Sequence, residues 1–241
     1  MIKVIVLDLD HTIGHFFIVS LIWNFMIKVK CNLNQVDFNI ICSIFPNVIR
    51  YNILSLFSYL SIRQRLNNHI KILIYTHNKN GIKWIKMITN YIEYKLNCKL
   101  FCNIIENTSI KSYNDFILKS GVPKTAKILF IDDSYHSNME HDKVIYLNIK
   151  KYSYFEKNNV IINNFITSDY FNKKIPSNVK EKVIDLFKNY LIHNNVEKIK
   201  SLDEKKIDKI VLKMILGYVQ KFLNEPNNNT RKNRKKLFIY G

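Results

Sequence analysis

The chain has 241 residues, of which 47% are hydrophobic, so it is long enough for one domain with an appendage and a sizeable core. Its net charge of +18 has two interpretations: lysine-rich, solvated helix faces, or attraction to an anionic partner such as a phosphoprotein, nucleic acid or an acidic protein. The four cysteines lack the spacing of a zinc site, and we expect free thiols in a reducing compartment.

No stretch of the sequence predicts secretion or membrane insertion. The N-terminal apolar run is short and leads directly into acidic residues, unlike a secretory signal peptide. The apolar residues 16–29 are too few to span a bilayer and include Asn24, so we expect a packed helix there. We expect an intracellular monomer, in the nucleus or the cytoplasm.

Short apolar, β-branched runs predict five strands, and apolar residues at helical spacing predict helices between them. The strands are expected at residues 2–7, 70–75, 100–105, 127–131 and 144–149, and the helices at 50–66, 80–96 and 110–120. Strands that alternate with helices predict an α/β fold, a three-layer α/β/α sandwich around a parallel, Rossmann-like sheet. Residues 13–49 form an aromatic insert after the first strand, and the whole domain is expected to cover residues 1–175.

Beyond Pro176 only helical patterns occur. Residues 176–224 predict two helices, the second opened by a capping box at residues 201–204. A hairpin docked on the preceding domain is the simplest arrangement, and a separate partner-binding module is the alternative. The tail, residues 225–241, is polar and expected to be flexible. Its five cations within residues 231–236 suit a nuclear-import signal, a nucleic-acid contact or simply a solvated tail.

Acidic and hydroxyl side chains stand where three of the predicted strands end. Asp8 and Asp10 follow the first strand, Thr76 follows the second, and Asp132 and Asp133 follow the fourth. Burying carboxylates close together is costly, so these pairs indicate a bound cation. Open α/β sheets have their active sites at this edge, and Mg²⁺ is the natural ion because it prefers oxygen ligands.

The sequence Asp8-Leu9-Asp10-His11-Thr12 resembles the first motif of the haloacid dehalogenase superfamily, and Thr76, Lys111 and the Asp132-Asp133 pair match its other motifs in order. The resemblance implies a magnesium-dependent phosphatase. Asp8 would attack phosphorus and Asp10 would serve as the general acid and base. Thr76 would bind the phosphoryl oxygens, and Lys111 would neutralise their charge.

The resemblance also implies the metal ligands. The Asp8 carboxylate and the Asp10 backbone carbonyl would bind Mg²⁺, together with Asp132 and Asp133, of which one would bind directly. Lys111 is the expected lysine of the site because it begins the helix before the fourth strand, although Lys119, Lys124 and Lys127 are alternatives.

Within the superfamily, residues 1–152 look most like the RNA-polymerase C-terminal-domain phosphatase-like branch, and in particular like divergent members from large DNA viruses, which would place the protein in a host cell. The further residues that carry this likeness are Arg50, Tyr75, His77, Asn78, Trp84, Asp115 and His136. It implies a serine/threonine protein phosphatase whose substrate contacts include Thr12, His77 and Asn78. Three positions depart from the branch: His11 stands where Glu is common, and Tyr51 and Tyr135 stand where Pro is common. These departures weaken the case for a polymerase tail as substrate.

Three further hypotheses remain open. The chain could be a small-molecule or nucleotide phosphatase of the same superfamily. It could also be a catalytically silent module that binds an acidic partner or nucleic acid through its basic surface. His11 could act as a second acid, but a surface histidine or a hydrogen-bonded turn histidine is the favoured interpretation.

Overall fold

The computed structural model describes residues 1–78, 80–106, 110–198, 200–225 and 236–239. Its sheet has six strands in the order β3-β2-β1-β4-β5-β6, and every neighbouring pair is parallel. The strands are β1 (Lys3–Leu7), β2 (Ile70–Thr76), β3 (Asn103–Glu106), β4 (Lys127–Asp132), β5 (Val144–Ile149) and β6 (Lys236–Ile239). The α/β fold and the five predicted strands are confirmed, although β3 begins later than expected.

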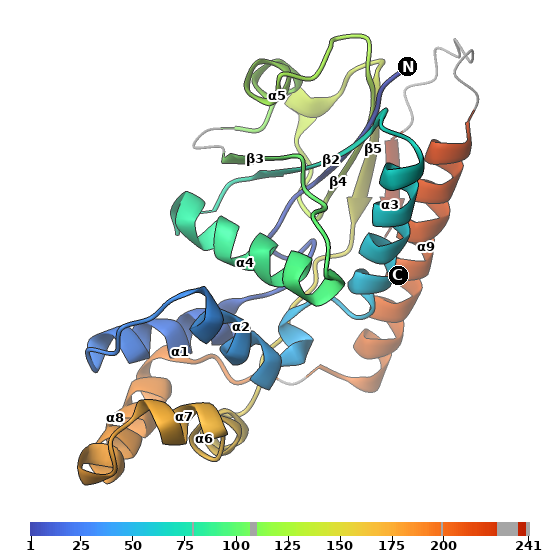
Figure 1. The fold of residues 1–241 in the computed structure, drawn as a ribbon. Coiled ribbons are helices and arrows are strands. Elements are labelled where there is room, and N and C mark those ends of the chain that lie inside the picture. The colour runs from blue at the N-terminus through green and yellow to red at the C-terminus, as the bar shows by residue number, and fades with distance from the viewer. Residues whose placement is uncertain (79, 107–109, 199, 226–235, 240–241) are drawn as a thin grey trace.

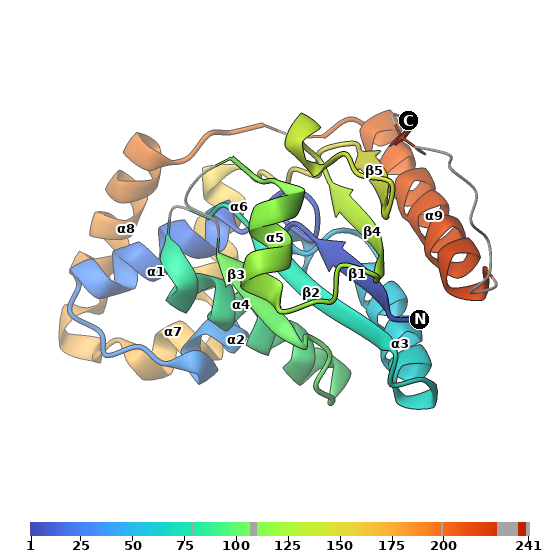
Figure 2. The same cartoon turned by 90° about the horizontal axis from the view of Figure 1, so that it is seen from above.

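Helices cover both faces of the sheet, as the alternation of buried side chains along β1 requires. Ile5 and Leu7 belong to a core shared with α3 (Ile53–Leu66), α4 (Gly81–Leu96) and α9 (Leu202–Asn224). Val4 and Val6 point into a smaller core on the other face, which α5 (Tyr113–Ser120) covers with Tyr113 and Phe116. Figures 1 and 2 show the resulting three layers.

A block of helices lies beyond the carboxyl ends of the strands (Figures 1 and 2). It contains α1 (Phe17–Lys28), α2 (Gln35–Ile44), α6 (Asn158–Ile166), α7 (Asp169–Lys174) and α8 (Lys180–Asn194). The short 3-10 helices η1 (Pro46–Val48), η2 (Ser137–Met139) and η3 (Ser177–Val179) lie in connections. The insert after β1 therefore packs with the segment that follows β5. Among the described residues, no helix combines the length and apolar character needed to cross a membrane.

The expected helical hairpin of residues 176–224 does not form. Helix α8 joins the helical block, where Phe187 packs 4.8 Å from Phe25 of α1, measured between ring centroids. Helix α9 lies apart from it against the sheet in both views (Figures 1 and 2). Each of the two helices has an apolar stripe. Such a stripe indicates that one face of the helix is buried, but it does not indicate which surface packs against that face.

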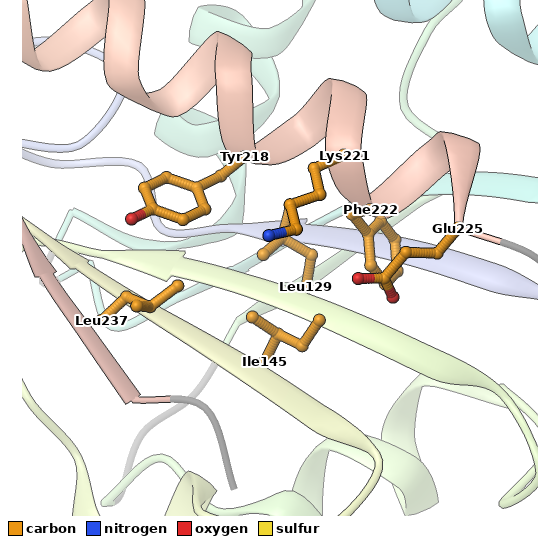
Figure 3. A pocket seen from close by; sticks show the side chains of 7 residues that line it. All are labelled: Leu129, Ile145, Tyr218, Lys221, Phe222, Glu225 and Leu237. Atoms are coloured by element: carbon orange, nitrogen blue, oxygen red, sulfur yellow. The ribbon is translucent and has the colours of Figure 1, made fainter. Parts of the chain in front are cut away.

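The last described segment also differs from the expected tail, because residues 236–239 form strand β6 beside β5. The basic residues 231–235 lie outside the described residues. Figure 3 shows a small pocket where Tyr218 and Phe222 of α9 face Leu129, Ile145 and Leu237 of strands β4, β5 and β6. Helix α9 thus covers the part of the sheet to which the chain's last described strand belongs.

Candidate active site

Lys111 forms the centre of the site. Its Nζ atom lies 2.6 Å from Oδ1 of Asp8 and 2.7 Å from Oδ2 of Asp132, and the side chain is buried. The helix expected from residue 110 begins only at Tyr113, and Lys111 precedes its N-cap, Ser112. The fold brings Lys111 to the carboxyl edge of β1 and β4. Burial lowers the pKa of Lys111, but the charges of Asp8 and Asp132 outweigh it and raise the pKa. The choice of Lys111 over Lys119, which pairs with Asp115 instead, is supported by this geometry.

Three carboxylates converge around this lysine. Asp8, Asp132 and Asp133 each offer an oxygen atom, and the three atoms lie within 4.8 Å of one another. Burial raises the pKa of Asp8 to about 7, although Lys111 opposes the rise. Burial and the charge of Asp132 also raise the pKa of Asp133. The protein therefore supplies too little positive charge to keep Asp8 and Asp133 ionised as readily as they would be in water. A cation beside them would favour their ionised forms.

The negative charge of the Asp132 carboxylate is balanced by protein groups more completely than the charges of Asp8 and Asp133. Its Oδ1 accepts a hydrogen bond from the Ser134 amide at 2.7 Å, and its Oδ2 faces Lys111 and, at 3.5 Å, His136. Burial opposes the ionised form of Asp132, but the bonds from His136 and Lys111 outweigh burial and lower its pKa. Asp132 is thus placed to hold Lys111, while Asp8 and Asp133 retain more capacity for a cation.

Thr12 joins the turn after β1 to the end of β4. Its Oγ1 donates to Oδ1 of Asp133 at 3.1 Å and accepts from the Asp133 amide at 3.0 Å. The side chain is buried. Thr12 was expected to contact substrate, whereas the structure uses its hydroxyl to fix the Asp133 carboxylate.

Asp10 lies outside the three-carboxylate group and has a partner of its own. Its Oδ2 accepts a hydrogen bond from Nδ2 of Asn78 at 2.5 Å, and Asn78 in turn accepts from the Asn80 amide at 2.8 Å. Burial raises the pKa of Asp10, and the bond from Asn78 opposes the rise. Asn78 was expected to contact substrate but is buried against Asp10, while the adjacent His77 is exposed.

The hydroxyl of Thr76 is buried at the same edge of the sheet. Thr76 ends β2, its side chain is only 1% exposed, and its Oγ1 has no hydrogen-bond partner among the described residues. A buried hydroxyl without a partner costs about 1–3 kcal/mol. Such a cost is understandable where a ligand oxygen completes the hydrogen bond.

Arg50 binds the backbone of the turn that carries Asp10 and Thr12, a role that the sequence pattern did not indicate. Its Nε donates to the carbonyl of Thr12 at 2.7 Å, and its Nη2 donates to the carbonyls of His11 and Lys150 at 2.7 and 2.9 Å. These partners are backbone atoms, which carry no residue signature, so only the fold reveals them. His11 lies 2.8 Å from the Tyr152 carbonyl through Nδ1, which confirms a hydrogen-bonded turn histidine.

Comparisons of the chain with protein-family models, with curated proteins and with solved structures found no match in any of the three.

Proposed function

We propose that the chain is a magnesium-dependent phosphatase of the haloacid dehalogenase superfamily that forms an aspartyl-phosphate on Asp8. The observation that carries the proposal is the arrangement of Lys111 between Asp8 and Asp132, with the unpartnered Thr76 hydroxyl at the same sheet edge. A nucleophilic carboxylate, a neutralising cation and a hydroxyl donor are the groups that phosphoryl transfer requires.

The donor set fits Mg²⁺. Asp8, which is buried, and Asp133, which is partly buried, supply carboxylate oxygens, and Asp132 lies close enough to contribute. Mg²⁺ commonly binds through one or two carboxylates together with water and a substrate phosphate. The Asp10 backbone carbonyl is the remaining protein ligand implied by the resemblance. When bound, the ion would reduce the repulsion between an anionic nucleophile and a phosphate ester.

The proposed reaction has two steps, transfer of the phosphoryl group to Asp8 and hydrolysis of the resulting aspartyl-phosphate. An oxygen of Asp8 attacks phosphorus, the bond from phosphorus to the leaving oxygen breaks, and protonated Asp10 gives its proton to that oxygen. Lys111 and Thr76 stabilise charge on the phosphoryl oxygens. Asp10, now ionised, then takes a proton from the water that attacks phosphorus and releases Asp8 and inorganic phosphate.

Phosphoserine or phosphothreonine in a protein is the proposed substrate, and the nucleus or the cytoplasm is the proposed location. The likeness of residues 1–152 to the polymerase-tail phosphatase branch supports this choice. The exposed side chains of His77, Ser134 and Tyr135 next to the site residues also suit a substrate that approaches along a surface.

The test is hydrolysis of para-nitrophenyl phosphate by the purified chain with Mg²⁺ or with excess chelator. Asp8→Asn keeps the shape of the nucleophile but removes its charge, and Asp142→Asn is the control because its side chain is 63% exposed. We expect turnover that depends on Mg²⁺, persists in Asp142→Asn and is lost in Asp8→Asn. Absence of turnover in folded wild-type protein, with salt-sensitive nucleic-acid binding, would favour the silent binding module.

A panel of phosphopeptides and free mononucleotides then tests the substrate class. We expect phosphopeptides to give the higher kcat/KM. Equal or faster turnover of mononucleotides would instead make the protein a nucleotidase.

A further inference from the structure

The turn that carries Asp10 and Thr12 depends on contacts from outside itself. Residue 11 of the turn is a histidine with φ of +61°, in the left-handed region that side chains with a Cβ rarely adopt. The turn closes through a hydrogen bond from the His11 amide to the Gly14 carbonyl at 2.6 Å. A backbone conformation of this kind persists where surrounding structure enforces it.

Arg50 and Tyr152 provide the nearest support. Arg50 binds the carbonyls of His11 and Thr12, as described above. The amide of Tyr152 donates to the His11 carbonyl at 2.8 Å, and its own carbonyl lies 2.8 Å from Nδ1 of His11. The Tyr152 hydroxyl is anchored on the Asn47 carbonyl at 2.7 Å. The turn is therefore held by one residue that precedes α3 and another that follows β5.

A second layer of contacts leads from Tyr152 to the C-terminal helix. The Arg50 guanidinium lies 5.2 Å from the centre of the Tyr152 ring, and Nζ of Lys200 lies 4.0 Å from it. Lys200 forms an ion pair with Asp208 of α9. The side chains of Lys200 and Asp208 are only 15% and 7% exposed, so this pair is largely shielded from solvent.

The charge of Asp208 also reaches Arg50. Burial lowers the pKa of Arg50 to about 10, and the Asp208 carboxylate makes the largest opposing contribution. Asp208 thus compensates two cations that both contact the Tyr152 ring, the buried Arg50 and the partly buried Lys200. Losing this carboxylate would leave both cations with less counter-charge in a region of low dielectric constant.

We propose that Asp208 is a positioning residue: through Lys200, Tyr152 and Arg50, it holds the turn that carries Asp10 and Thr12. Helix α9 would then be part of the catalytic unit rather than an accessory module. The expected effect on kcat rests on the proposed phosphatase function. The effect of Asp208 on the conformation of the turn can be measured without any activity.

The test compares Asp208→Asn with Asp203→Asn in the full chain. Asp203 is a matched control because it is also on α9 and pairs with a lysine, Lys206, but its side chain is 83% exposed. For Asp208→Asn we expect kcat for para-nitrophenyl phosphate to fall about tenfold with little change in KM, since misplacement of a reacting group slows the chemical step. Asp208→Glu should recover part of the loss, and Asp203→Asn should match the wild type.

Amide hydrogen exchange of the turn supplies the readout that does not need turnover. In Asp208→Asn we expect the amides of residues 11–14 to exchange about tenfold faster, while those of β2 stay protected. If Asp208→Asn does not fold, Lys200→Gln takes its place, with the same expected changes in kcat and exchange.

The two proposals fail in different ways. A folded variant with wild-type kcat and wild-type exchange at residues 11–14 would overturn the role of Asp208. Absence of turnover in the wild type, with faster exchange in the variant, would overturn the phosphatase proposal and leave the coupling from α9 standing.

Discussion

Nδ2 of Asn78 lies 2.5 Å from Oδ2 of Asp10 and donates a hydrogen bond to it. Asn78 comes from the connection between β2 and α4, and Asp10 comes from the turn after β1, so the bond joins two neighbouring strand ends. A donor fixed in this position stabilises the carboxylate and sets its direction. The proposed acid and base of the reaction is therefore controlled by a neutral neighbour.

Replacing Asn78 by Ala should move the pH dependence of turnover. The hydrogen bond favours ionised Asp10, so its loss raises the pKa of Asp10, and the limb of the kcat profile that reports the titration of Asp10 should move to higher pH. Asn80→Ala is the control, because its exposed side chain does not cap α4. A kcat profile of Asn78→Ala that superimposes on that of the wild type would contradict this role.

Replacing Lys111 by Met should affect both activity and stability. The substitution leaves Asp8 and Asp132 buried together without their shared cation, and removal of one partner from a buried ion pair costs about 3–5 kcal/mol. We expect that decrease in the free energy of unfolding in urea, and a loss of turnover of at least about a hundredfold.

Lys119→Met provides the comparison for Lys111→Met. Lys119 also pairs with an aspartate, but its side chain is 38% exposed, so the free energy of unfolding should change by no more than about 1 kcal/mol. Equal destabilisation by the two substitutions would show that Lys111 is not the electrostatic centre of the site.

Stabilisation by Mg²⁺ should increase with pH. The pKa of Asp8 rises from 3.8 to about 7 on folding, so between these values the metal-free folded state binds a proton that the unfolded state releases. That contribution to stability is present at low pH and is lost as the pH rises through about 7. Because Mg²⁺ competes with this proton, it should raise Tm more at pH 7.5 than at pH 5.5.

The comparison of magnesium with chelator at each pH is essential here. The pKa of His11 is lowered to about 4, mainly by burial, so this group makes the protein more stable as the pH rises from about 4 to 6.5. That slope opposes the slope from Asp8, but it is expected with and without the ion. A Tm increment from Mg²⁺ that is the same at both pH values, or that persists in Asp8→Asn, would argue against Asp8 as a ligand.

Replacing Ile239 by Ala should destabilise the whole fold if β6 is an integral strand. Ile239 is 1% exposed, and truncation of a buried isoleucine costs about 2–5 kcal/mol. We expect the midpoint of urea unfolding to fall accordingly. Ile192→Ala on α8 should have little effect, because Ile192 is 64% exposed, and equal midpoints for the two variants would contradict the packing of β6.

Local patterns predicted the strands and most of the helices because burial on both faces demands continuous apolar runs. The site was predictable for a related reason: the carboxyl ends of parallel strands meet at one edge, so acids and hydroxyls at those ends converge. Asp8, Thr76 and Asp132 follow this rule. Lys111 needed the resemblance as well, since a lysine before a helix has no pattern of its own.

The roles of Thr12 and Asn78 could not be predicted, because each depends on a partner far away in the chain. The hydroxyl of Thr12 is bound to Asp133, and the amide of Asn78 is bound to Asp10. A sequence motif indicates that such residues lie near a site, but not whether their polar atoms face a ligand or another side chain.

The sequence by itself determined the parallel sheet, the helices that cover it and the edge at which its acidic groups gather, since these follow from periodicity and from where strands end. Only the tertiary structure decided where the C-terminal helices pack. Helix α8 joins the block beside α1, whereas α9 lies against the sheet and extends a charged contact through Lys200 to Tyr152. The physical reason is that hydrophobic burial is non-directional, so the partner of an apolar face depends on the shape of the whole fold.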